Sequence, residues 1–239
     1  MFISDKMFWI NSWQQIKWKL SLYRHKMLVH VAILLFFVLL GGMGTNSSGT
    51  SIGIYNIELT NYDLTLYVVI GGLLTFIFGM MVGSKSEFLA NYVIPTTRMT
   101  SNFSNSIVLL VVSLLNTVLC FCNLYISTAA LVIISDGNVF LDITNLFSFS
   151  HFIALICFFW MISGIGYLFV SIGGIKWWLS TAIVMLIVLL FNSLSLMPTI
   201  IEWMVQGGAI WFSLKCLCIT FISYLLTFVC SKQLEVRYK

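Results

Sequence analysis

Six long apolar stretches divide the chain, and polar residues gather in the segments between them. The stretches cover residues 27–44, 65–84, 106–134, 150–174, 177–195 and 209–230. Each is close in length to the about 20 residues that an α-helix needs to cross the hydrocarbon core of a bilayer. The pattern therefore predicts an all-α integral membrane protein with six transmembrane helices.

The segments between these spans alternate in charge. Basic residues fall before the first span, between the second and third, between the fourth and fifth, and after the sixth. The other three segments contain no lysine or arginine and hold the acidic residues Glu58, Asp63, Asp136, Asp142 and Glu202. Because basic segments stay on the cytoplasmic side, we expect both termini in the cytoplasm, an N-in/C-in topology.

Composition agrees with a single transmembrane domain over residues 1–239. With 60% hydrophobic and 8% charged residues, the chain has too little polar surface for a soluble protein. All six cysteines lie within the spans, so neither a disulfide framework nor a metal site is expected. An excess of lysine over arginine with frequent asparagine and isoleucine favours a bacterial plasma membrane.

The first 26 residues show helical periodicity. Four apolar residues recur at intervals of four, three and four, on one helix face: Trp9, Trp13, Ile16 and Leu20. We predict that residues 1–26 form a cytoplasmic interfacial helix, anchored by its tryptophans, with Lys17 and Lys19 toward anionic lipid. The alternative is a basic tail that only orients the first span.

Small residues follow one face of the second span. Gly71, Thr75, Gly79 and Gly83 succeed one another at intervals of four. Such a seam lets another helix approach closely, so its predicted role is helix packing.

Polar residues follow one face of the third span, at Ser113, Asn116, Cys120, Asn123 and Ser127. Buried amides need partners in hydrocarbon, so the stripe must face protein or water. Two interpretations remain open: interhelical hydrogen bonding, or a translocation path lined by Ser113, Asn116, Asn123, Ser127 and Lys215. The patch expected to receive the stripe comprises Ser163, Gly164, Gly166, Tyr167 and Ser171 of the fourth span.

Lys215 lies near the outer end of the sixth span. Its long stem can carry the ammonium to the outer headgroups, and pairing with Glu202 is an alternative. An electrostatic role in a translocation path is the third interpretation.

The cytoplasmic segment 85–104 contains an unusual group of apolar residues. Phe88, Leu89 and Tyr92 are spaced for a short amphipathic helix that Pro95 ends. Solvated loops rarely hold so many apolar side chains, so this segment is predicted to dock on another protein.

Together, these features resemble the permease subunit of an ABC type-2 exporter, of the kind that handles antimicrobial peptides or lantibiotics. In that family the loop between the second and third spans carries the coupling helix that docks on an ATPase. The resemblance implies a re-entrant or interfacial extracellular segment at residues 196–208. It also implies ATPase coupling by Phe88, Asn91, Tyr92, Pro95 and Arg98.

The chain lacks the G-x-x-x-x-G-K-[ST] motif, so it is not expected to be an enzyme itself. The resemblance implies two copies of a cytoplasmic ATPase, which would bind ATP and Mg, and a second permease subunit, identical or related. No nucleic acid is expected as a partner. The expected activity is outward movement of an amphipathic peptide or small hydrophobic compound.

Two other classes of membrane protein are alternatives. An intramembrane enzyme is disfavoured, because no serine-protease or metal motif lies within the spans. The remaining alternative is an integral protein without a dedicated ATPase: an immunity or sensor protein, or a vitamin-binding transporter component.

Overall fold

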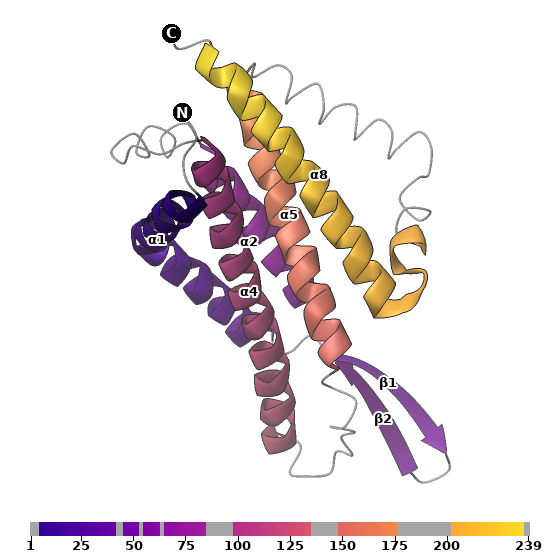
Figure 1. The fold of residues 1–239 in the computed structure, drawn as a ribbon. Coiled ribbons are helices and arrows are strands. Elements are labelled where there is room, and N and C mark those ends of the chain that lie inside the picture. Colours follow the sequence, from indigo (N-terminus) through magenta and orange to yellow (C-terminus); the bar gives the residue numbers. More distant parts are fainter. Residues whose placement is uncertain are drawn as a thin grey trace.

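The structure is a computed structural model in which residues 5–41, 45–52, 55–62, 65–84, 98–134, 148–175 and 202–236 are described. Figure 1 shows a group of long helices with one strand hairpin at its lower end. In chain order the elements are α1 (Asp5–Gly41), β1 (Thr45–Ile52), β2 (Tyr55–Tyr62), α2 (Thr65–Val82), α4 (Arg98–Ile134), α5 (Phe149–Ile175) and α8 (Gly208–Val236).

Helices α2, α4, α5 and α8 correspond to the predicted apolar stretches 65–84, 106–134, 150–174 and 209–230. Three are long and apolar enough to cross a membrane, over Met99–Ile126, Phe149–Gly174 and Gly208–Cys230, and Tyr67–Val82 is a shorter apolar helix. The prediction of a helical membrane protein is confirmed to the extent that the described residues include these three helices. The predicted fifth span, 177–195, lies outside the described residues.

Helix α1 includes both the predicted interfacial helix and the start of the first predicted span. It runs without a break for 37 residues, where the sequence analysis placed a boundary at residue 26. Residues 5–36 contain neither glycine nor proline, so nothing in the local sequence interrupts the helix.

The segment between α1 and α2 forms an antiparallel hairpin, in addition to the expected helices. Thr45 pairs with Tyr62 at the open end, and Ile52 pairs with Tyr55 at the turn. The charge pattern predicts only an outer loop here, although apolar and polar residues alternate from Tyr55 to Thr60, as is typical of a β-strand.

Helix α5 packs against α2, α4 and α8, and α4 also packs against α1. One buried cluster joins four of these helices through Tyr23, Phe78, Val108, Leu109 and Tyr167. Helix α5 is therefore central to the bundle, and it contributes the Tyr167 and Trp160 side chains described below.

The contact between α2 and α5 is very close. A Cβ atom on Gly79 would overlap the Ser163 carbonyl, and one on Gly166 would overlap the Phe76 carbonyl. A Cβ on Gly83 would lie 3.0 Å from the Tyr167 ring. Two glycines of the predicted seam thus face α5, and neither position has room for a larger residue without a shift.

The other end of the seam faces α4. A Cβ on Gly71 would lie 2.7 Å from the Asn116 amide nitrogen. Thr75 is fully buried, and its hydroxyl donates a 2.9 Å hydrogen bond to the Gly71 carbonyl of its own helix. The seam therefore meets two different helices along its length.

Candidate functional site at the start of helix α4

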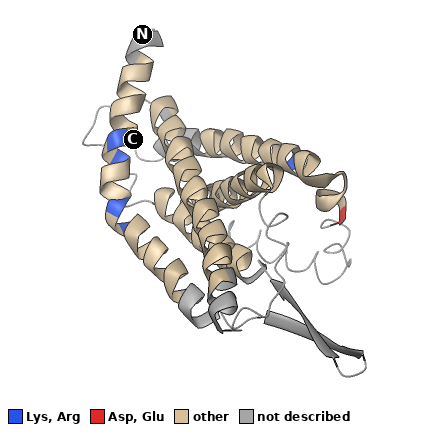
Figure 2. Ribbon diagram, turned by 90° about the horizontal axis from the view of Figure 1, so that it is seen from below, with Lys and Arg blue, Asp and Glu red and all other residues tan. Residues whose placement is uncertain are grey.

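Helix α1 presents its polar face to the protein. Lys19 is fully buried, and Ser12 and Gln15 share its buried face. Trp9 and Trp13 are 62% and 58% exposed. Figure 2 shows Lys and Arg residues gathered along one stretch of α1. The prediction that Lys19 faces anionic lipid is wrong, because this side chain points into the contact with α4.

The remaining residues of the predicted anchoring stripe turn inward. Ile16 is only 4% exposed, and Leu20 packs against the central cluster around Tyr23. The stripe therefore divides: its tryptophans face outward from the bundle, and its aliphatic members contribute to helix packing. Lys17 lies 5.5 Å from the centre of the Trp13 ring, on the exposed side.

The Lys19 ammonium is surrounded by oxygen atoms of α4. It donates hydrogen bonds to the Ser101 carbonyl at 3.2 Å, to the Ser104 hydroxyl at 2.8 Å, and to the Asn105 amide oxygen. A fourth hydrogen bond, of 3.4 Å, reaches the Ser101 hydroxyl, and all four of these acceptors are neutral. Burying an ammonium is costly, and several hydrogen bonds at once offset part of that cost.

The hydrogen bonds continue from α4 to α5. The Asn105 amide donates to the Tyr167 hydroxyl at 2.9 Å, and this hydroxyl donates to the Asn102 amide oxygen at 2.7 Å. We call these six residues the Lys19 network: Lys19, Ser101, Asn102, Ser104, Asn105 and Tyr167. It ties α1, α4 and α5 together at the first two turns of α4.

The sequence predicts that Tyr167 belongs to a patch that contacts asparagines, namely those of the polar stripe that begins at Ser113. The structure brings Tyr167 to the asparagines that precede this stripe. A local signal for them exists, because six of the seven residues from Thr100 to Ser106 are polar.

Replacing Lys19 with Met is expected to lower the free energy of unfolding by about 1–3 kcal/mol, because the Asn105 amide oxygen loses its buried donor. The matched control is Lys17→Met, which removes an exposed cation and a contact worth about 0.5–1 kcal/mol. Thermal unfolding of both variants in the same detergent makes the comparison. Equal midpoints would contradict a structural role for the buried ammonium.

The polar stripe of α4 lies between helices. Ser113, Asn116 and Asn123 are all fully buried, and the side chain of Ser127 lies outside the described residues. The Asn116 amide oxygen is 3.4 Å from His30 Nε2 of α1, and Asn116 also contacts the Gly71 position of α2. Of the two interpretations, these contacts favour interhelical bonding for Asn116.

Lys215 lies apart from this stripe. Its ammonium donates to the Trp203 carbonyl and, at 2.9 Å, to the Gln206 carbonyl, and it lies 4.7 Å from the centre of the Trp203 ring. Residues 202–205 form a helical turn, which Gly207 and Gly208 connect to α8 with positive φ angles of 99° and 80°. Lys215 thus holds the end of this turn against α8.

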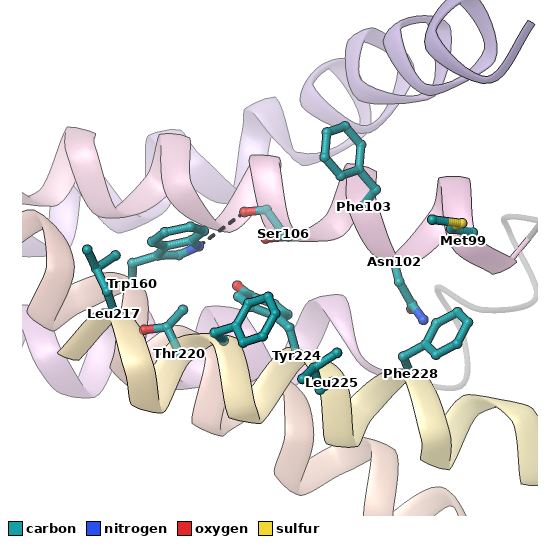
Figure 3. A pocket seen from close by; sticks show the side chains of 11 residues that line it. Met99, Asn102, Phe103, Ser106, Trp160, Leu217, Thr220, Tyr224, Leu225 and Phe228 are labelled. Atoms are coloured by element: carbon teal, nitrogen blue, oxygen red, sulfur yellow. Dashed lines mark hydrogen bonds between the residues drawn. The ribbon is translucent and has the colours of Figure 1, made fainter. Parts of the chain in front are cut away.

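A pocket of about 620 Å³ opens beside the Lys19 network, between α4, α5 and α8 (Figure 3). Asn102 belongs to both. The described lining residues are Met99, Asn102, Phe103, Ser106, Trp160, Leu217, Thr220, Phe221, Tyr224, Leu225 and Phe228. They come from helices that are distant in sequence, and the sequence analysis did not identify the pocket.

No protein-family model, curated protein or solved structure matches this chain.

The residues carried over from the exporter resemblance adjoin the network in sequence. Phe88, Asn91, Tyr92 and Pro95 lie outside the described residues. Arg98 is the first residue of α4, with its side chain outside the described part. The described part of this segment therefore begins at Arg98, which lies three residues before Ser101, the first α4 residue of the Lys19 network.

Proposed function

We propose that this chain is the membrane-spanning permease subunit of an ATP-driven exporter in a bacterial plasma membrane. It has six spans with both termini in the cytoplasm, and it moves an amphipathic peptide or small hydrophobic compound outward. The observation that carries the proposal is the position of the Lys19 network, whose α4 members lie at the end of the segment that resembles a coupling loop.

The network supports a mechanical role for that segment. A push on residues 85–97 acts first on the start of α4, where Ser101, Ser104 and Asn105 bond to α1 and α5. Helices joined by several hydrogen bonds move more readily as one body than separately. Closure of the ATPases would thus displace three helices together instead of α4 alone.

The distribution of charge supports the topology. Five basic residues of α1, Lys6, Lys17, Lys19, Arg24 and Lys26, lie before the predicted first span begins at residue 27. Figure 2 shows an acidic residue, drawn in red, apart from the basic stretch of α1. In the sequence, Glu202 lies six residues before α8 begins. A basic cluster at the beginning of the chain, away from the acidic loop, agrees with a cytoplasmic N-terminus.

The proposed assembly contains two copies of an ATPase, which bind ATP and Mg, and a second permease subunit. The competing proposal is an integral immunity, sensor or vitamin-binding protein without a dedicated ATPase. The two proposals differ in one observable: whether an ATPase remains bound to this chain after gentle extraction.

The test is affinity purification of the tagged chain, expressed from its native locus and extracted in mild detergent. We expect a protein with the G-x-x-x-x-G-K-[ST] motif to co-purify in a fixed ratio, and an unrelated tagged membrane protein from the same cells to lack it. Recovery of the chain alone, in both detergent and nanodiscs, would favour the competing proposal.

A further inference from the structure

Helices α1 and α4 run side by side in the same direction after their first turns. The Lys19 ammonium bonds to the Asn105 amide oxygen, and His30 Nε2 lies 3.4 Å from the Asn116 amide oxygen. Both contacts join residues that are 86 positions apart along the chain. The two helices therefore advance equally between these contacts.

The first turns of α1 leave this line. With the same offset, Phe8 and Trp9 would lie level with residues before the start of α4. Their rings instead lie 5.9 and 5.7 Å from the Phe103 ring of α4. In Figure 1 these indigo turns are foreshortened, whereas α5 and α8 are seen lengthwise. The first turns of α1 thus lie across the start of α4, where the apolar stretch Met99–Ile126 begins.

One stripe of α1 is exposed along this part of the helix. Its members follow one another at intervals of four, four, four and three: Trp9, Trp13, Lys17, Ser21 and Arg24. Such intervals keep residues on one helix face, and all five side chains are exposed. Two cations and two aromatic rings therefore share this side of α1, which we call the Trp9–Arg24 stripe.

The chemistry of the stripe fits an anionic phospholipid. After Asp5, α1 contains no acidic residue, so Lys17 and Arg24 have no counter-ion on their own helix. Basic residues at a membrane surface attract anionic headgroups, and tryptophans concentrate between headgroups and hydrocarbon. A soluble polyanion would meet the cations from the water, whereas the tryptophans lie where an apolar span begins. A lipid accounts for both.

We propose that the Trp9–Arg24 stripe binds anionic phospholipid at the membrane surface. Lys17 and Arg24 contact the phosphate groups, and the two tryptophans pack beside the glycerol and the upper acyl chains. The lipid is a structural partner and is distinct from the exported compound, so this inference goes beyond the proposed function. Binding requires no ATPase.

The buried side of α1 gives this binding a structural consequence. Lys19 lies two residues after Lys17, about 200° away around the helix, and is bonded to the start of α4. Lipid on one side of α1 therefore holds the other side against α4. A ligand that binds only the folded state raises its stability, so anionic lipid should raise the midpoint of thermal unfolding.

The test uses the purified full chain, freed of lipid in detergent and titrated with phosphatidylglycerol or phosphatidylcholine of equal chain length. Native mass spectrometry counts the bound lipids. We expect phosphatidylglycerol to bind about thirtyfold more tightly, the preference that two basic residues near an anionic surface provide. It should also raise the thermal midpoint more than phosphatidylcholine at the same concentration. Equal affinity for the two lipids would overturn the inference.

Lys17→Gln with Arg24→Gln tests the cations. This double variant should bind phosphatidylglycerol about thirtyfold more weakly and leave phosphatidylcholine binding unchanged. The matched control is Lys232→Gln with Arg237→Gln, an equal loss of charge at the other end of the chain, which should retain the preference. Gel filtration and the thermal midpoint in phosphatidylcholine establish that both variants are folded. An equal loss of preference in the two would mean that net charge alone matters, and would overturn the site.

Trp13→Ala tests the aromatic part of the stripe. Its matched control is Trp211→Ala, because Trp13 and Trp211 are 58% and 59% exposed. Trp13→Ala should weaken phosphatidylglycerol binding about fivefold, the factor for one aromatic contact of typical strength, and Trp211→Ala should leave it unchanged. The same affinity in both variants would contradict a role for the tryptophans.

A competition experiment separates lipid from a soluble anion. Glycerol 1-phosphate carries the phosphate of the headgroup without acyl chains, and it should not displace phosphatidylglycerol at equal concentration. Displacement would assign the stripe to a soluble anion and overturn the inference. These measurements involve no ATPase, so their failure and a failed co-purification of the ATPase are distinguishable.

Discussion

Replacing Gly79 with Ala is expected to destabilise the protein by about 3 kcal/mol or more, enough to remove most folded protein from detergent extracts. The added methyl group would overlap the Ser163 carbonyl oxygen and lie 2.9 Å from its carbon. Both are backbone atoms of α5, so no side chain can rotate away. Helices α2 and α5 would have to separate where they are closest.

That separation would spread along the contact. Gly83 meets Tyr167, and Gly166 meets the Phe76 carbonyl, within the same interface. Tyr167 is also a member of the Lys19 network, so a displaced α5 would weaken the hydrogen bonds to Asn102 and Asn105. One methyl group thus disturbs packing and polar contacts together.

Gly164→Ala is the matched control, with the same substitution in a membrane helix. A Cβ at this position would lie 3.6 Å from the Tyr224 ring, an ordinary van der Waals distance. Its effect should be neutral or slightly stabilising, because alanine favours a helix over glycine. The measurements are the monodisperse yield and the thermal midpoint. Similar values for the two variants would show that α2 and α5 do not pack as described.

The positions of several helices followed from the sequence alone. The predicted stretch 65–84 corresponds to α2 at Thr65–Val82, and 150–174 corresponds to α5 at Phe149–Ile175. This agreement has a physical cause, because the thickness of the bilayer fixes the length of an apolar helix. The hairpin was not predicted, because only β2 carries a local signal, the alternation of apolar and polar residues from Tyr55 to Thr60, and β1 has none.

The Lys19 network could not be derived from local sequence. The acceptors of Lys19 lie 82 to 86 residues away along the chain. The orientation of α1 was also ambiguous, because the apolar stripe of a helix at a membrane can face lipid while its polar face contacts protein. In water an apolar stripe faces the protein core, so the same pattern has the opposite meaning in the two solvents.

The pocket was missed for a related reason. Its described lining comes from three helices, and Trp160, Tyr224 and Asn102 each look like ordinary members of their own apolar stretch or its edge. Only the packing of α8 on α5, and of α5 on α4, brings them together. A pocket of this kind is a property of tertiary structure, which periodicity along one helix does not encode.

Replacing Tyr92 and Arg98 together with Ala is expected to abolish ATPase association. Tyrosine and arginine, with tryptophan, are enriched among interface hot spots, and truncating a hot-spot residue costs about 2 kcal/mol or more. The loss of both corresponds to about a thousandfold weaker binding. The measurement is the amount of ATPase recovered per tagged chain in the co-purification described above.

The control is Lys85→Ala with Ser86→Ala, two changes in the same segment at positions that the exporter resemblance does not assign. This variant should retain the ATPase. Normal ATPase recovery with the Tyr92 and Arg98 variant would show that the segment is not the coupling loop. The thermal midpoint separates docking from folding: Arg98 precedes the first network residue of α4 by three positions, so an unchanged midpoint indicates that the Lys19 network is intact. Loss of the ATPase at an unchanged midpoint is therefore the result that assigns ATPase docking to the loop.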